Sequence, residues 1–314
     1  MSKIVVIDPM TLLGRESLNE LGERNYQFDE LELFHTSEVE EHQVTAAGGR
    51  AMLVSRLQSP IDLEGVEVII LCSDAENEGL DVLDRVLEVE QDVLFVDASS
   101  ISRYEHLGHP VASGRSLPSS RRMRLADPAL VMAMRLMEVL GEFQVRALSL
   151  ASVQPVSALG KGGIETLARQ SARRLQGENL EEGEEILAFN MLAVDPKKLW
   201  RDGMALFPEL EVTVSLATGS CFHGHLLQFG LRFAESVGAE DVENALRSSD
   251  LLRRIDFPMD LSLVPDRQQI LVGEALLSED GKSLLLQAMA DGSRIGGAMI
   301  LADLLESGFQ VGSP

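Results

Sequence analysis

Apolar residues in the first third of the chain follow two alternating spacings. Short continuous runs, such as 3–7 and 67–71, are typical of buried parallel strands, whereas 12–22 and 77–89 place apolar residues at helical intervals. Further strand-like runs lie at about 29–34, 50–57 and 93–98. Strands that alternate with helices predict an α/β fold with a Rossmann-like, doubly wound parallel sheet.

The pattern changes in the second part of the chain. Residues 99–126 are rich in Ser, Gly, Pro and Arg and predict a long loop. After it come two helical patterns, DPALVMAMRLMEVLGEF and KGGIETLARQSARRL, and long alternating segments that predict a half-exposed antiparallel or mixed sheet. These alternating segments lie at 209–219, 221–234, 269–278 and 282–290.

Three regions follow from this pattern. We expect a Rossmann-like domain of the NAD(P)-binding type over 1–126 and an α+β dimerisation or catalytic-type domain with a mixed sheet over 127–293. The closing pattern SRIGGAMILADLLES predicts a helix with an apolar stripe, and we expect 294–314 to pack back on the first domain.

The turn after the first strand has the position of a dinucleotide site but little of its chemistry. In a dinucleotide site, a glycine-rich turn lets the phosphates approach the backbone N–H groups at the N-terminus of the helix. This turn offers Asp8 and Thr11 instead, and only Gly14 remains of the expected glycines. The carboxylate of Asp8 repels a pyrophosphate, and both side chains fill space that it needs. We therefore expect a degraded cofactor site.

Composition narrows the classes of partner. The 314 residues carry 50 acidic and 27 basic side chains, a formal charge of −23, which disfavours nucleic acid and anionic membranes as partners. We expect a cytoplasmic protein, since no apolar run or signal pattern predicts a membrane or secretory segment. Cys72 and Cys221 lie in apolar strand-like runs, so we expect buried reduced thiols and no metal site.

Several segments, in order, resemble the aspartate-semialdehyde dehydrogenase family over almost the whole chain. They are the opening unit KIVVIDPMTLLGRE, VLFVDASSISR, QPVSALGKGGIETLARQSARRL, LAFNML, FHGH and the closing ADGSRIGGAMILADLLE. The closest likeness is to the family's Usg-like branch, whose members have degraded catalytic residues. The resemblance implies the dehydrogenase fold and a homodimer formed by the C-terminal domains.

Active members of the family use a cysteine thiolate as nucleophile, a histidine as acid and base, an arginine for the substrate carboxylate, and NADP as hydride acceptor. The resemblance places Leu130 at the nucleophile position and Thr218 at the arginine position. A hydroxyl cannot replace a bidentate guanidinium. His225 matches the acid/base histidine and Gln154 the active-site glutamine.

Three further positions follow from the same resemblance. Arg103 matches an anion-binding arginine that holds phosphate, although a plain surface arginine fits the loop equally well. Glu38 falls near the position where family members carry an arginine that binds the 2′-phosphate. Gly292 falls where they carry an asparagine near the nicotinamide.

Three hypotheses remain open from the sequence. The first is a non-catalytic dimeric homologue that binds or regulates, with no cofactor, including in a mixed dimer with an active paralogue. The second is an enzyme with altered chemistry around His225 and Gln154. The third is a working oxidoreductase of the family that acts on an aldehyde or acyl phosphate with NADP or NAD. We favour the first, because nucleophile, cofactor glycines and substrate arginine are each lost separately. The exposed apolar strands of the second sheet independently favour a homodimer.

Overall fold

The computed structural model describes residues 3–24, 30–37, 42–47, 50–113, 120–180, 183–260 and 269–306. The chain divides into two compact units, each with its own sheet. The first unit comprises Met1–Leu125 together with Gly297–Pro314, and the second comprises Ala126–Gly296.

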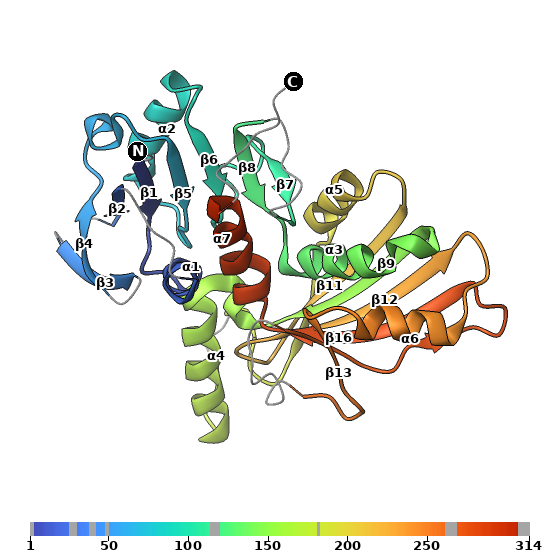
Figure 1. Ribbon diagram of the computed structural model, residues 1–314. Coiled ribbons are helices and arrows are strands. Elements are labelled where there is room, and N and C mark those ends of the chain that lie inside the picture. Colours follow the sequence, from blue (N-terminus) through green and yellow to red (C-terminus); the bar gives the residue numbers. More distant parts are fainter. Residues whose placement is uncertain are drawn as a thin grey trace. The chain divides into compact units, whose positions relative to one another are not determined.

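The first unit is built on a sheet whose strands follow the order β3-β4-β2-β1-β5-β6-β8-β7 (Figure 1). All neighbouring pairs among its described strands are parallel except β3 with β4 at one edge. The strands are β1 (Lys3–Ile7), β2 (Glu30–His35), β3 (His42–Ala47), β4 (Arg50–Arg56), β5 (Val68–Leu71), β6 (Leu94–Asp97), β7 (His109–Val111) and β8 (Arg122–Leu125). This sheet confirms the predicted Rossmann-like fold class.

Helices attach to the first sheet through its central strands. Leu80 and Leu83 of α2 (Leu80–Val89) are fully buried in one apolar cluster with Val5, Ile7 and Phe95, and each such side chain contributes about 2 kcal/mol. Helix α1 (Leu12–Glu23) contacts α7 (Met299–Glu306). Arg24 at the end of α1 forms ion pairs with Asp303 and Glu306, so the last helix belongs to the first unit.

The second unit holds a mixed sheet in the order β10-β11-β9-β12-β16-β14-β13, with β15 beside β16. Its strands are β9 (Val145–Gln154), β10 (Met191–Val194), β11 (Glu211–Gly219), β12 (His225–Phe233), β13 (Leu252–Arg254), β14 (Ile270–Val272), β15 (Leu276–Leu277) and β16 (Ser283–Ala290). Its helices are α3 (Pro128–Leu140), α4 (Gly160–Leu175), α5 (Lys197–Leu206) and α6 (Ala239–Arg247). The mixed sheet confirms the second half of the predicted fold class.

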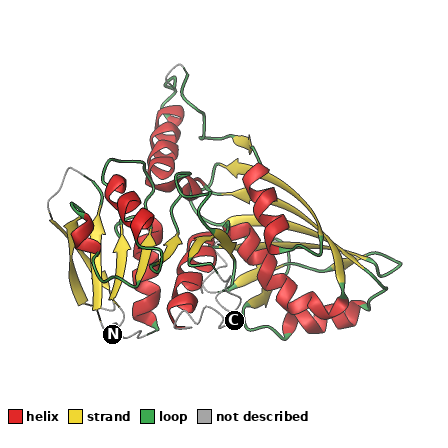
Figure 2. Ribbon diagram, turned by 90° about the horizontal axis from the view of Figure 1, so that it is seen from above, coloured by secondary structure: helices red, strands yellow, loops and turns green. Residues whose placement is uncertain are grey.

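One face of the second sheet is covered and the other is open. Helix α3 packs on β9 and β12, α5 packs on β11, and α6 packs on α3 and β13, as Figure 1 shows. Figure 2 shows the strands of this sheet with helices along one side. Side chains alternate between buried and solvent-accessible along β9, β12 and β16. We call the second set the open face: Ala147, Ser149, Ala151, Val153, Glu211, Thr213, Ser215, Ala217, Leu226, Gln228, Gly230, Arg232, Ser283, Leu285, Gln287 and Met289.

Two expectations about local structure were wrong. Residues 99–126 are not one long loop, because the described part of this stretch contains β7 and β8, which extend the parallel sheet. These strands are only three and four residues long, β7 begins with a histidine and a proline, and β8 contains two arginines, so they give no apolar run. The alternating segment 269–278 is also not one strand: it is divided into β14 and β15, and each pairs separately with β16.

Candidate functional site

The turn after β1 is closed by its own hydrogen bonds. Asp8 adopts a left-handed conformation with φ of 56°, a region that glycine adopts more readily. Its carboxylate accepts hydrogen bonds from the backbone N–H of Thr36 at 2.8 Å, from Thr36 Oγ1 at 2.7 Å and from Ser73 Oγ at 2.6 Å. The side chain therefore joins the carboxyl ends of β1, β2 and β5. A negative charge is fixed in the turn.

Thr11 and Gly14 complete this turn. Thr11 is the N-cap of α1, where its Oγ1 accepts a hydrogen bond from the N–H of Gly14 at 3.2 Å and donates one to the carbonyl of Cys72 at 2.8 Å. A Cβ at Gly14 would lie 2.7 Å from the Cα of Pro9. Gly14 thus lets the first helical turn approach the backbone before it.

Arg103 is engaged by carboxylates of its own unit. Its guanidinium pairs with Asp81 and Asp84 on α2, and Glu76 lies 3.5 Å away. Asp84 also accepts a hydrogen bond from the hydroxyl of Tyr104 at 2.7 Å. The anion-binding role of Arg103 stays a prediction, and these carboxylates compete with any anion for the guanidinium. Glu38 lies outside the described residues.

Three positions singled out in the second unit fall in one row across its sheet. Thr218 of β11 is in register with Gln154 of β9, and His225 of β12 is in register with Ala290 of β16. Since Leu226 pairs with Val153, His225 follows beside Gln154 in the antiparallel ladder. All four side chains are buried on the covered face. Gln154 Nε2 donates a hydrogen bond to Thr218 Oγ1 at 3.0 Å, so these two polar groups satisfy each other.

The side chain of His225 is buried and lies near two carboxylates. It is 3% exposed, and within the described part of the chain neither ring nitrogen has a hydrogen-bond partner. Burial lowers the pKa of His225, while the nearby carboxylates of Asp127 and Asp291 act in the opposite direction. Both carboxylates are used locally: Asp127 caps α3 through the N–H of Ala129, and Asp291 accepts from Ser293.

Sequence reasoning missed the two carboxylates beside His225. Asp127 gave an available signal, because an aspartate directly before a proline commonly caps a helix. Its nearness to β12 depends on how α3 packs on the sheet, which no local pattern reveals. Gly292 lies against His225, because a Cβ at this position would overlap the ring of His225 and lie 2.8 Å from the Cβ of Pro128.

Leu130 sits in the first turn of α3 and is fully buried. Its Cδ2 is 3.4 Å from where a Cβ on Gly203 of α5 would stand, so the side chain fills the space between α3 and α5. An aliphatic side chain offers neither a nucleophile nor a proton. The side chain of Leu130 therefore packs against α5 at the position where the resemblance places the nucleophile.

The two cysteines differ in burial. Cys72 is buried, and burial together with nearby Asp8 and Asp97 raises the pKa of its thiol. Cys221 is only partly buried, which corrects the expectation for that residue, and burial raises the pKa of its thiol as well. Both thiols are free. Among the described residues, no group of three or more His, Cys, Asp and Glu side chains is arranged to hold a metal ion, and no helix is long and apolar enough to cross a membrane.

The buried His225 predicts a pH-dependent stability. Its folded pKa lies below the ordinary value of about 6.5, so below that pH the unfolded chain takes up a proton that the folded chain does not. The free energy of unfolding should therefore fall as the pH falls below about 6.5, with a slope from this group of at most about 1.4 kcal/mol per pH unit. Urea unfolding of the native protein and of His225→Ala between pH 7.5 and pH 5.5 would measure it. Parallel pH curves for the two proteins would contradict the prediction.

Comparison with known proteins places this fold. No family model matches the chain. Aspartate-semialdehyde dehydrogenase 2 of Vibrio cholerae is 24% identical, and the alignment covers 94% of each chain. A crystal structure of aspartate semialdehyde dehydrogenase II from Vibrio cholerae, complexed with ASA, aligns with a TM-score of 0.83 at 19% identity and covers 98% of this chain and 97% of the other. A probable aspartate-semialdehyde dehydrogenase from Pseudomonas aeruginosa aligns with a TM-score of 0.81 at 20% identity and covers 98% of each chain.

These comparisons confirm the resemblance predicted from the sequence. The chain has the aspartate-semialdehyde dehydrogenase fold over nearly its whole length, and its sequence relatives are enzymes of that name. The sequence identities of 19% to 24% are consistent with a divergent branch.

Proposed function

We propose that this chain is a non-catalytic homologue of the aspartate-semialdehyde dehydrogenases, of the Usg-like kind, that acts as a dimeric binding or regulatory protein in the cytoplasm. The observation that carries the proposal is Leu130. The resemblance puts the catalytic thiol at this position, and here a fully buried leucine fills it. Covalent catalysis on an aldehyde or acyl phosphate has no nucleophile without that thiol.

The polar row of the second sheet supports the same conclusion. Recognition of a substrate carboxylate needs a cation, and Thr218 at the arginine position supplies a hydroxyl that already accepts from Gln154. His225 keeps the identity of an acid/base residue. Neither of its ring nitrogens has a hydrogen-bond partner in the described residues, so no hydrogen bond there fixes its tautomer or the orientation of its ring.

The cofactor turn does not fit NADP. Dinucleotide phosphates need backbone N–H groups that are free to face them and no opposing charge. Asp8 brings a carboxylate into that turn and is held there by Thr36 and Ser73. Thr11 Oγ1 accepts the hydrogen bond of the Gly14 N–H at the N-terminus of α1, so this N–H is not free to bind a phosphate. We therefore propose that the chain works without NADP or NAD.

One observation favours an alternative function. The buried His225, whose two ring nitrogens have no hydrogen-bond partner among the residues that the structure describes, is a costly feature beside the retained Gln154, and costly polar burial is common in active sites. The alternative is an oxidoreductase that acts on an aldehyde or acyl phosphate with NAD(P). It requires the dinucleotide to bind, so cofactor affinity separates it from the main proposal.

We expect calorimetric titration with NADP, and separately with NAD, to give a dissociation constant in the millimolar range or weaker. The matched variant is Asp8→Asn, because asparagine tolerates a positive φ, keeps the shape of the side chain and removes its charge. It should bind NADP about tenfold more tightly than the native protein, since a repulsive charge near a phosphate costs about 1.4 kcal/mol. Low-micromolar binding of NADP by the native protein would favour the alternative instead.

A further inference from the structure

The chain passes between its two units at two places. The first unit ends at Leu125 and resumes at Gly297, so the second unit is entered at 126 and left at 296. We call the segments 126–128 and 291–296 the two connectors. The first ends on Pro128 at the start of α3, and the second runs into a π-helix, Arg294–Ala298, which spans the boundary between the units. Short π-helical turns are rare, and they occur frequently at functional sites.

Two glycines bring the connectors into direct contact. A Cβ at Gly296 would lie 2.6 Å from the Cα of Pro128, and a Cβ at Gly292 would lie 2.8 Å from the Cβ of the same proline. The Cβ at Gly292 would also lie 2.3 Å from Cε1 of the His225 ring. Glycine, which has no side chain, allows this close approach at both positions. The buried ring of His225 therefore lies where the two connectors meet.

Each connector also places one carboxylate near this ring. Asp127 of the first connector and Asp291 of the second both raise the pKa of His225, against the larger effect of its burial. Each carboxylate is engaged within its own connector. Oδ1 of Asp127 accepts the N–H of Ala129 at 2.8 Å, and Oδ1 of Asp291 accepts the hydroxyl of Ser293 at 2.6 Å. These hydrogen bonds fix the chain where each connector enters its helix.

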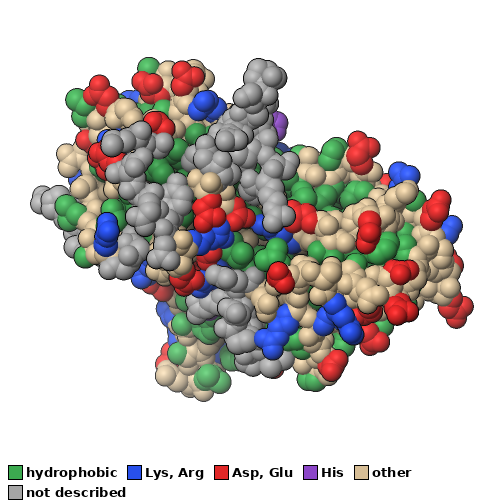
Figure 3. All heavy atoms as spheres, in the orientation of Figure 1, with side chains coloured by type: hydrophobic (Ala, Val, Ile, Leu, Met, Phe, Trp, Pro, Cys, Tyr) green, Lys and Arg blue, Asp and Glu red, His purple; other side chains and the backbone are tan. Residues whose placement is uncertain are grey.

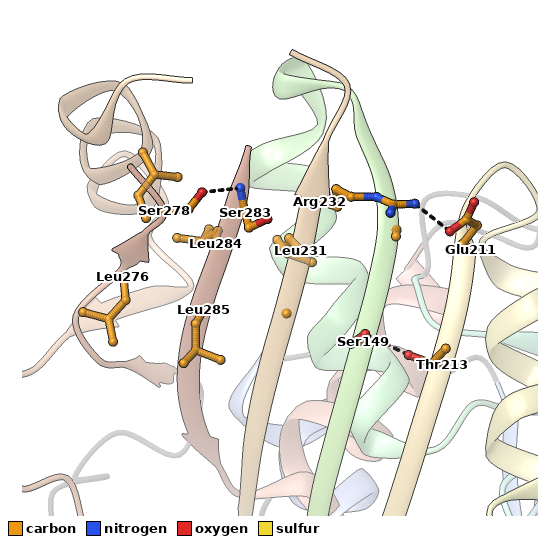
Figure 4. Close-up of a pocket in the computed structure, with 13 residues that line it drawn as sticks. Ser149, Glu211, Thr213, Leu231, Arg232, Leu276, Ser278, Ser283, Leu284 and Leu285 are labelled. Carbon is orange, nitrogen blue, oxygen red and sulfur yellow. Dashed lines mark hydrogen bonds and ion pairs between the residues drawn. The ribbon is translucent and has the colours of Figure 1, made fainter. Parts of the chain in front are cut away.

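The other elements around the ring add few charges beside it. Its neighbours in the sheet, Gln154 on β9 and Ala290 on β16, are uncharged. Arg294 in the π-helix is the only basic side chain of the two connectors. The remaining charged side chains of α3, β9 and β12 lie further along these elements, and Figure 4 shows the last of the pairs among them: Arg135 with Glu138, Arg146, and Arg232 with Glu211. A proton on the ring therefore attracts Asp127 and Asp291 first.

We infer that His225 is a pH-sensitive latch on the two connectors: they pack together around the neutral ring, and protonation of the ring releases them. A buried cation needs a partner of opposite charge. The protonated ring obtains one when Asp127 or Asp291 leaves its local hydrogen bond, or it moves out to water. Either change disturbs the contact with Gly292 and loosens both connectors. This inference does not depend on whether the chain is catalytic.

The release occurs on acidification. Burial lowers the pKa of His225 while the connectors are closed, whereas a ring that has opened to water has the ordinary pKa of about 6.5. Protons therefore bind the open form more tightly and shift the population toward it below a pH of about 6.5. One pH unit further down, the open population has risen by up to about tenfold.

Hydrogen exchange of the whole protein follows the connectors, when it is measured by mass spectrometry at pH 7.5 and pH 5.5 and corrected for the intrinsic exchange rate. We expect backbone protection in peptides 126–134 and 291–299 to fall by up to about tenfold at the lower pH. This exchange should hardly accelerate in urea below the unfolding transition, because a local opening exposes little surface. The pH response should disappear in His225→Gln, whose amide takes up no proton in this range.

His35→Gln is the matched control. His35 on β2 of the first unit is 3% exposed, like His225, and neither of its ring nitrogens has a hydrogen-bond partner in the described residues. Acidic side chains are spread over the surface that Figure 3 shows, so acidification also protonates surface carboxylates. His35→Gln shares that effect with the native protein and lacks a different buried histidine. It should keep the pH response of the connectors.

Asp291→Asn tests the latch with the ring of His225 in place. Asparagine keeps an oxygen that accepts the local hydrogen bond and removes the charge that raises the pKa of His225, so the pH response should move to lower pH. Equal protection of the connectors at both pH values overturns the inference. So does a response that survives His225→Gln or that Asp291→Asn leaves at the same pH. Connector exchange that accelerates in urea as steeply as that of β5 also overturns it, because His225 then acts on global stability alone.

Discussion

Replacing Gly292 by alanine should lower the free energy of unfolding of the second unit by about 3 kcal/mol. The added Cβ would overlap the ring of His225, which is buried, and stand 2.8 Å from the Cβ of Pro128 in the first turn of α3. The resemblance gives asparagine at this position. Gly292 and the buried ring of His225 therefore form a pair in this chain: the ring occupies the volume that a side chain at 292 needs.

A double-mutant cycle isolates that pair. In a His225→Ala background the overlap with the ring disappears, so Gly292→Ala should cost less, with a coupling free energy of about 2 kcal/mol. Gly162→Ala is the control, because a Cβ at Gly162 in α4 meets nothing within 4 Å and should be neutral or slightly stabilising. Denaturant unfolding measures the stability of the four proteins of the cycle and of the Gly162→Ala control. Equal costs of Gly292→Ala in both backgrounds would show that His225 does not occupy the contested volume.

Much of the first unit could be predicted because its signals are local. Residues 4–7 of β1 are a continuous apolar run, and the helical spacing after Thr11 extends to Glu23. Strands β7 and β8 could not be predicted in the same way, since three or four residues pair in the sheet whatever their own pattern. Their neighbours lie far away in sequence and supply the hydrogen bonds.

The candidate site also has a part that the sequence predicts and a part that depends on contacts between distant segments. Leu130, Thr218 and His225 were identified as positions from the order of the segments that resemble the family. That Thr218, Gln154 and His225 share one row depends on the register of three strands, which the sequence does not encode locally. The hydrogen bonds to Asp8 could not be predicted from the sequence either, because Thr36 and Ser73 lie 28 and 65 residues away along the chain.

The purified protein should show no NADP-dependent oxidation of aspartate semialdehyde. Leu130 supplies no thiol, and loss of the nucleophile costs roughly a million-fold in enzymes that act by covalent catalysis. Neither cysteine can substitute for it. Cys72 is buried and the pKa of its thiol is raised, and the partly buried Cys221 also has a raised pKa, so neither thiol is ionised near neutral pH.

The variant Leu130→Cys tests whether the missing thiol alone accounts for the absence of activity. It restores a thiol at the N-terminus of α3, but the site is fully buried, and Thr218 still offers no cation for a carboxylate. We expect no recovery of turnover and a loss of about 2 kcal/mol of stability from the cavity that the smaller side chain leaves. Recovery by this single change would show that the rest of the active site is intact.

The proposed loss of catalysis is tested most directly by the rate at which the native protein forms NADPH from aspartate semialdehyde, phosphate and NADP. Active enzymes of ordinary efficiency turn over about 10 times per second. We expect a rate that equals the buffer control and does not rise with protein concentration. A rate that scales with protein concentration and disappears in His225→Ala would contradict it.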